Sequence, residues 1–162
     1  MPTDDSGRAF TLHLQDEAAT LSLGAALAAV VKPGMTVFLS GELGAGKTTL
    51  TRGLLLALGY TGRVKSPTYG LVELYVVSGL YLYHFDFYRF KEAREFGDAG
   101  LWEHFGEHSL CVVEWPEKAQ GQLPVPDLNI TLEISDAGGR TAEVASATES
   151  GQRCFDALKR HL

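Results

Sequence analysis

One stretch constrains the fold of this chain more than any other: residues 40–50 read "SGELGAGKTTL". They follow the β-branched and aromatic run "MTVFLS" and lead into "KTTLTRGLLLAL", whose apolar residues recur at helical spacing. In the pattern G-x-x-x-x-G-K-[ST] between a strand and a helix, glycines let backbone N–H groups converge on phosphate oxygens, the lysine reaches the β and γ oxygens, and the hydroxyl can ligate Mg²⁺. We therefore predict a nucleoside triphosphate site on residues 41–48.

Strand and helix patterns alternate along the rest of the chain. The run 109–115 ("SLCVVEW") is almost continuously apolar, as expected for a central strand that is buried on both faces. These patterns predict an α/β protein in which residues 1–162 form one domain. Strands are expected at residues 8–14, 35–40, 71–77, 80–90, 109–115, 128–134 and 141–146, and helices at 16–31, 47–58, within 91–108 and at 151–162.

Composition narrows the possible partners and location. The net charge of -6 and the pI near 5.3 argue against independent binding to nucleic acid, which normally leaves a basic surface. Cys111 and Cys154 belong to no CxxC pair, so neither a disulfide framework nor a zinc knuckle is indicated. No apolar stretch approaches the ~20 residues needed to span a bilayer, and the acidic N-terminus is not typical of a signal peptide. We expect a cytoplasmic protein with no membrane contact.

Two carboxylates are candidates for the metal that accompanies a nucleotide. Glu114 ends the run 109–115, and Asp86 ends "LYLYHFD". A phosphate-loop enzyme needs an acid at the end of a neighbouring strand to hold Mg²⁺ or its water. Glu114 is the more anomalous, because burying an acid in so apolar a run is costly without a cation or hydrogen-bond donors. We favour Glu114 as the metal ligand and Asp86 as the residue that orders water, although either carboxylate could instead cap its strand in an ion pair.

Four motifs in order resemble those of the TsaE family, also called YjeE: "GELGAGKTTL", "SPTY" at 66–69, "HFDFYR" at 84–89 and "VVEWPEK" at 112–118. The resemblance covers nearly the whole chain. It implies a P-loop NTPase-like fold with a mixed β-sheet flanked by helices, and ATP with Mg²⁺ as ligands. It also implies ATP hydrolysis in the bacterial threonylcarbamoyl modification of tRNA adenosine 37, with TsaB and TsaD as partners and tRNA reached only through them.

The resemblance also implies roles for individual residues. Lys47 corresponds to the phosphate-binding lysine, Thr48 to the metal-binding hydroxyl and Glu114 to the magnesium carboxylate. Thr68 in "SPTY" resembles a switch threonine that responds to the γ-phosphate, and Asp86 resembles the catalytic acid. The catalytic residues predicted are thus Lys47, Thr68, Asp86 and Glu114, and the nucleotide-binding residues are Glu42, Gly44, Ala45, Gly46, Lys47, Thr48, Thr49 and Trp115.

Other interpretations remain open at this point. A small-molecule kinase would use the same loop, although no arginine-rich lid is recognisable, and a nucleotide-dependent interaction module would hydrolyse nothing. We interpret "DAGG" at 136–139 as a hairpin turn and not a GTPase switch. "HFGEH" at 104–108 matches a zinc-protease pattern, but Gly106 interrupts its helix, so we expect solvated polar residues there. The aromatic arm 80–90 is expected to pack on the core, with Tyr88 and Arg89 as candidates for a partner surface.

Overall fold

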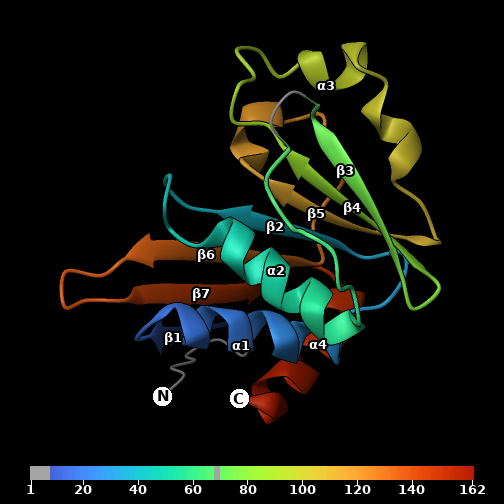
Figure 1. Cartoon of the computed structure of the whole chain (residues 1–162). Helices are drawn as coiled ribbons and strands as arrows, with labels where there is room; N and C mark the ends of the chain where they lie inside the picture. The colour runs from blue at the N-terminus through green and yellow to red at the C-terminus, as the bar shows by residue number, and fades with distance from the viewer. Residues whose placement is uncertain (1–7, 68–69) are drawn as a thin grey trace.

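The computed structural model describes residues 8–67 and 70–162, and these ranges form one seven-stranded sheet in the order β1-β7-β6-β2-β5-β4-β3 (Figure 1). The neighbours β6, β2, β5 and β4 run parallel, while β3 pairs antiparallel with β4 and the β7–β1 pair completes the other edge. The predicted mixed α/β sheet is confirmed. Its strands are β1 (Ala9–Leu14), β2 (Thr36–Ser40), β3 (Val72–Val77), β4 (Leu80–Asp86), β5 (Ser109–Glu114), β6 (Leu128–Ile134) and β7 (Arg140–Ser146).

The helices begin and end at residues suited to those positions. Figure 1 shows α1 (Glu17–Ala28) and α2 (Lys47–Leu58) side by side in front of the sheet, with α4 (Glu149–His161) beyond α1. Asp16 caps α1 by accepting a hydrogen bond from the N–H of Ala19 at 2.8 Å, and the Thr148 hydroxyl caps α4 in the same way. The short segments α3 (Glu95–Asp98), η1 (Leu101–His104) and η2 (Pro116–Ala119) complete the chain. Among the described residues, no helix has the length and apolar character needed to cross a membrane.

Three predicted boundaries differ from the structure by two residues or more, each for a local reason. The predicted helix over 16–31 ends at Ala28, where the next N–H groups turn back to carbonyls of the last turn. The aromatic arm leaves the sheet after Asp86, because residues 87–90 form a turn in which the Phe90 N–H donates to the Phe87 carbonyl. The last helix starts at Glu149, two residues earlier than predicted, because Thr148 provides its cap.

Both predicted hairpin turns are confirmed. Ser78 and Gly79 join β3 to β4 with φ angles of 53° and 73°, the positive values of a tight hairpin turn. Gly138 and Gly139 likewise have positive φ between β6 and β7. The "DAGG" stretch is therefore a hairpin turn, as interpreted from the sequence.

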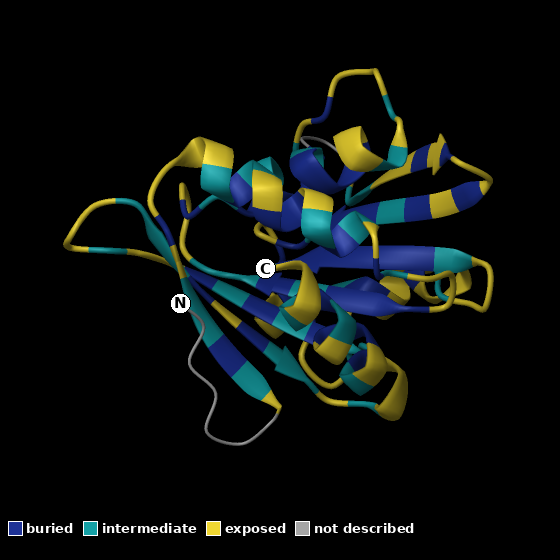
Figure 2. Ribbon diagram, turned by 90° about the horizontal axis from the view of Figure 1, so that it is seen from below, coloured by how far each residue is buried: buried dark blue, intermediate teal, exposed yellow. Residues whose placement is uncertain are grey.

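The central strand β5 is buried on both faces, as its composition predicted. Leu110 and Val112 join the hydrophobic cluster that contains residues of α1 and α2, whereas Cys111 and Val113 join a second cluster with Phe87 and with residues of α3 and η1. Figure 2 shows the buried colour running along the central strands. The aromatic arm packs into the second cluster through Phe85 and Phe87, which are fully buried.

The strand order brings the candidate residues to one edge of the sheet. Because β2, β5 and β4 are parallel neighbours, their carboxyl ends meet at the same edge, where ligands of open α/β sheets bind. In the register of the sheet, Glu114 lies beside Leu39 on one side and Asp86 on the other. The loop after β2 then carries the chain directly into α2.

Candidate nucleotide site

The glycine loop opens α2 without any capping side chain. Gly46 occupies the N-cap position with φ of 108°, a conformation that costs glycine nothing, and it makes no side-chain cap hydrogen bond. The first N–H groups of a helix have no acceptor inside the helix, and they carry the positive end of its dipole. At Gly41 a Cβ would lie 2.4 Å from the Leu132 carbonyl oxygen, so only glycine lets the loop pass this close to β6. The loop thus presents N–H groups suited to an anion.

Lys47 lies inside the loop. The side chain is 5% exposed, its Nζ donates to the Gly41 carbonyl, and Nζ lies 3.7 Å from the centroid of the Trp115 ring. Burial lowers the pKa of Lys47, and the negative charges of Glu114 and Asp86 oppose that shift. A buried cation held by a carbonyl and an aromatic face is suited to an anionic partner.

Glu114 and Thr48 are in contact, as the metal-site hypothesis requires. Glu114 is 3% exposed, and its Oε2 accepts a hydrogen bond from Thr48 Oγ1 at 3.2 Å. Thr48 Oγ1 is also 2.6 Å from Ser66 Oγ. A hydroxyl and a carboxylate are hard oxygen ligands of the kind that Mg²⁺ prefers, and Mg²⁺ commonly takes only one or two carboxylates beside substrate phosphates.

Asp86 lines a hollow at this edge of the sheet together with the residues described above. Its Oδ1 accepts a hydrogen bond from the N–H of Tyr88 at 2.9 Å. Burial raises the pKa of Asp86 and the nearby Glu114 adds to that rise, while the Tyr88 N–H opposes it. The hollow has a volume of about 370 Å³, and Lys47, Thr48, Asp86 and Glu114 all line it.

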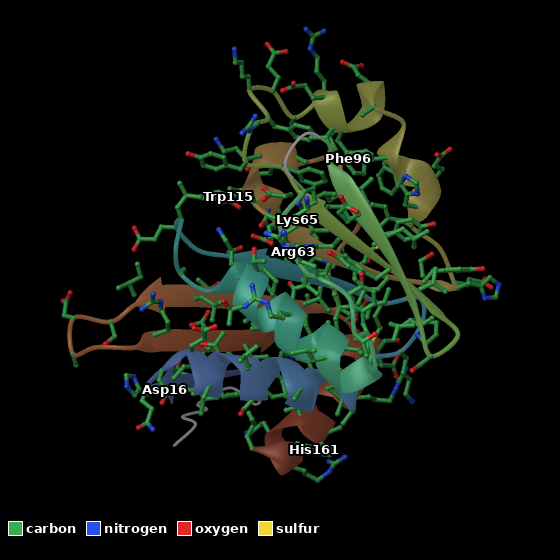
Figure 3. The ribbon with its side chains drawn as sticks, viewed as in Figure 1. Asp16, Arg63, Lys65, Phe96, Trp115 and His161 are labelled. Atoms are coloured by element: carbon green, nitrogen blue, oxygen red, sulfur yellow. The ribbon has the colours of Figure 1, made fainter. Side chains whose placement is uncertain are left out.

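Trp115 is held in an unusual backbone conformation. Its φ of 59° is in the left-handed region, which costs a residue with a Cβ about 1–2 kcal/mol. The next residue is Pro116, which normally favours an extended conformation in the residue before it. This geometry places the indole against Lys47, with the Tyr88 ring centroid 5.1 Å away. Figure 3 labels Trp115, which lies near the end of β2 and the start of α2. Such strain is frequent where a functional side chain must be held in one place.

The structure brings most of the predicted residues together and separates a few. Gly44, Gly46 and Thr49 line the hollow with the residues above, and so does Trp115. The Glu42 side chain is exposed and the Ala45 side chain is buried in the core, and neither residue lines the hollow. Thr68 lies outside the described residues.

Three residues that had no predicted role also lie at this site. Ser66 contacts Thr48, and His84 lies 2.5 Å from Glu114. Arg140, at the start of β7, donates to the Gly44 carbonyl at 2.9 Å and so ties the loop to the β6–β7 hairpin. Ser66 and His84 fall within the quoted motifs, a signal that could have drawn attention to them, whereas no local signal marks Arg140.

Comparison with known proteins shows which family the chain resembles. Residues 14–142 match the family described as threonylcarbamoyl adenosine biosynthesis protein TsaE. The chain belongs to the TsaE family. A relative from Haemophilus influenzae is 39% identical over 153 residues, which cover 91% of this chain and 96% of the relative. One from Bacillus subtilis is 36% identical, over 88% of this chain and 89% of the relative. Both are named tRNA threonylcarbamoyladenosine biosynthesis protein TsaE.

A solved structure supports the fold of this TsaE family member over almost its whole length. The crystal structure of Bacillus subtilis YdiB matches with a TM-score of 0.82 at 29% sequence identity, covering 99% of this chain and 97% of that one. The family and the fold predicted from the motifs are therefore both confirmed.

Proposed function

We propose that this chain binds and hydrolyses Mg²⁺-ATP as a component of the bacterial machinery that makes N6-threonylcarbamoyladenosine at position 37 of tRNA. The observation that carries the proposal is the convergence of Lys47, Thr48, Asp86 and Glu114 on one hollow at the uncapped start of α2. The names of the relatives support the tRNA modification. The family resemblance supplies TsaB and TsaD as partners, and the acidic charge of the chain favours contact with tRNA through them.

The residues of the hollow fit a nucleotide with its metal. An ammonium has three donors, and Lys47 uses one on the Gly41 carbonyl, which leaves two for phosphate oxygens. The first N–H groups of α2 provide further donors. Thr48 and Glu114 would hold the Mg²⁺, and the ion would supply charge neutralisation to the phosphates.

Asp86 has the position and environment of a residue that orients water. Its Oδ1 accepts a hydrogen bond from the Tyr88 N–H, which holds the carboxylate in one orientation and leaves Oδ2 to accept from a water in the proposed reaction. Burial raises the pKa of this carboxylate and so makes it a stronger base than an exposed aspartate, which suits it to accept a proton from water. We therefore give Asp86 the water-orienting role.

Partners are proposed to accelerate this reaction. In other phosphate-loop systems a group supplied in trans raises turnover by ~10³–10⁵-fold. The Thr48–Ser66 contact joins the metal-binding hydroxyl to the first residue of "SPTY". We propose that Thr68, in the same motif, responds to the γ-phosphate and presents that state to TsaB and TsaD.

Phosphate release and ATP binding test the proposal when measured for the chain alone and with TsaB and TsaD, beside a screen for phosphorylated acceptors. We expect slow turnover alone, faster turnover in the assembly and no phosphorylated acceptor. Lys47→Ala should weaken ATP binding and stop hydrolysis with a native circular dichroism spectrum, whereas Lys32→Ala, at an exposed lysine before β2, should behave as wild type.

Each alternative predicts a different outcome. A phosphorylated acceptor would identify a kinase, and binding with no release in any mixture would identify an interaction module. Turnover by the chain alone that equals turnover by the assembly would refute the partner's role. So would normal stimulation of Thr68→Ala, which we expect to keep nucleotide binding and lose stimulation.

A further inference from the structure

His84 is a buried histidine in the candidate site to which the proposed reaction assigns no task. It lies on β4, two residues before Asp86, and its side chain is fully buried. In the parallel pairing of β4 with β5, His84 is level with Val112, which is two residues before Glu114. Because side chains alternate along strands, His84 and Glu114 emerge on the same face of the sheet, the face that carries α2.

The hydrogen bonding of His84 assigns its tautomer. Nε2 lies 2.5 Å from Glu114 Oε2, and Nδ1 has no hydrogen-bond partner among the described residues. If Nε2 donates to the carboxylate, Nδ1 keeps only a bare lone pair. The opposite tautomer would bury an N–H without an acceptor, and orphaned N–H groups are the rarer and more costly defect. We therefore assign a proton to Nε2, which faces Glu114, and none to Nδ1.

This bond determines which oxygen of Glu114 remains available. Oε2 accepts from His84 Nε2 and also from Thr48 Oγ1 at 3.2 Å. Among the residues that the structure describes, none donates a hydrogen bond to Oε1. Two donors from different elements, β4 and α2, thus hold the same oxygen and fix the rotation of the carboxylate.

We propose that His84 is a positioning residue: it holds Oε2 of Glu114 so that Oε1 is presented to the divalent cation. The inference rests on the proposed function, because it concerns the cation of that site. Removal of a residue that hydrogen-bonds to a metal ligand and orients it typically lowers metal affinity by about 10–100-fold. This role requires a donor at the position of Nε2 and no hydrogen-bond partner for Nδ1. The ring meets both conditions, because Nε2 faces Glu114 and Nδ1 has no partner among the described residues.

Three variants separate this role from simple packing. His84→Gln keeps an N–H donor near the place of Nε2, whereas His84→Leu fills space and donates nothing. His104→Leu is the control, because His104 packs on the Tyr83 ring at 4.6 Å and makes no contact with Glu114. Circular dichroism of each variant checks the fold.

The measurement is Mn²⁺ binding followed by electron paramagnetic resonance, with the chain in excess over a non-hydrolysable ATP analogue. We expect His84→Leu to weaken Mn²⁺ binding by about 10–100-fold, His84→Gln to stay within about threefold of wild type, and His104→Leu to match wild type. Unchanged Mn²⁺ affinity in His84→Leu, or a His84→Gln as weak as His84→Leu, would overturn the proposal.

A second readout needs only the wild-type chain. Nitrogen-15 NMR of the imidazole should show the proton on Nε2 and an unprotonated Nδ1, and a proton on Nδ1 would overturn the assignment even if no His84 variant folds. Failure of the proposed function is distinguishable, because wild type itself would then show no metal-dependent binding of the analogue. With wild-type binding intact, a negative result in the variants counts against His84 alone.

Discussion

The contact between α1 and α2 gives a prediction whose size follows from the structure. A Cβ added to Gly24 would lie 2.2 Å from the Leu50 carbonyl oxygen and 2.7 Å from the Leu54 amide nitrogen. Gly53 is in the reciprocal position, with a Cβ 2.3 Å from the Leu21 carbonyl oxygen. All of these obstacles are backbone atoms, so no change of side-chain rotamer relieves the clash. Gly24→Ala must therefore push the two helices apart.

The cost of that displacement can be worked out in order of magnitude. Bringing the nearest contact to an ordinary distance requires a shift of roughly 1 Å, and overpacking of this kind costs about 1–3 kcal/mol or more. Alanine in place of glycine inside a helix raises the free energy of unfolding by about 1 kcal/mol, because its helix propensity is higher. With the cost at the upper end, because backbone is met on several sides, we expect a net loss of about 2 kcal/mol of unfolding free energy. In a chain of this size that corresponds to about 4–8 °C in Tm.

Urea unfolding followed by circular dichroism measures this effect. The matched control is Gly97→Ala in α3, where the nearest atom to an added Cβ is Gln122 Oε1 at an ordinary 3.6 Å, and which should lose no stability. The Leu50 N–H bonds the Gly46 carbonyl at 2.9 Å, so a shift of α2 reaches the glycine loop. Misplacement by about 1 Å can cost ~10²-fold in turnover, which we expect for Gly24→Ala. Unfolding of Gly24→Ala at the same urea concentration as wild type would refute the reasoning.

The remaining predictions concern two carboxylates and a thiol. Glu114→Gln should raise the Mg²⁺ concentration needed for half-maximal turnover, because an amide is a poor ligand for a hard cation; an unchanged Mg²⁺ titration would move the metal role to Asp86. Asp86→Asn should lower turnover by about 10²-fold or more while nucleotide affinity, measured by calorimetry, stays near that of wild type. Burial raises the pKa of Cys111 from 9.0 to about 12, so above pH 9 the unfolded thiol ionises and the folded thiol does not, and stability falls as pH rises. Between pH 8 and about 10.5, wild type should lose about 2 kcal/mol more of its unfolding free energy than Cys111→Ala does; parallel losses would show that Cys111 is not the cause.

Local patterns predicted those parts of the site that local chemistry determines. The glycine loop, the start of α2 and the buried run that ends at Glu114 each follow from residues adjacent in the chain. The sequence places Glu114 and Asp86 at the ends of two strands, but their neighbouring positions follow from the order β2-β5-β4, which no local pattern specifies. The four family motifs implied the roles of individual residues, which hydrophobic periodicity does not specify.

Other features depend on contacts between distant segments. In the aromatic arm, alternation does not reveal which face His84 takes, so its bond to Glu114 was not predictable. Arg140 meets Gly44 across 96 residues of chain. The left-handed conformation of Trp115 contradicts the usual preference before a proline, and it exists because the surrounding site holds the indole against Lys47.

The most direct test of the central claim is a crystal structure of the chain with Mg²⁺ and a non-hydrolysable ATP analogue. We expect the phosphates on the N–H groups at the start of α2, with Lys47 Nζ on the β and γ oxygens. We also expect the metal within about 2.1 Å of Thr48 Oγ1, with Glu114 bound to the ion or to one of its waters. Phosphates bound elsewhere on the chain, or a metal that contacts neither Thr48 nor Glu114, would contradict the central claim.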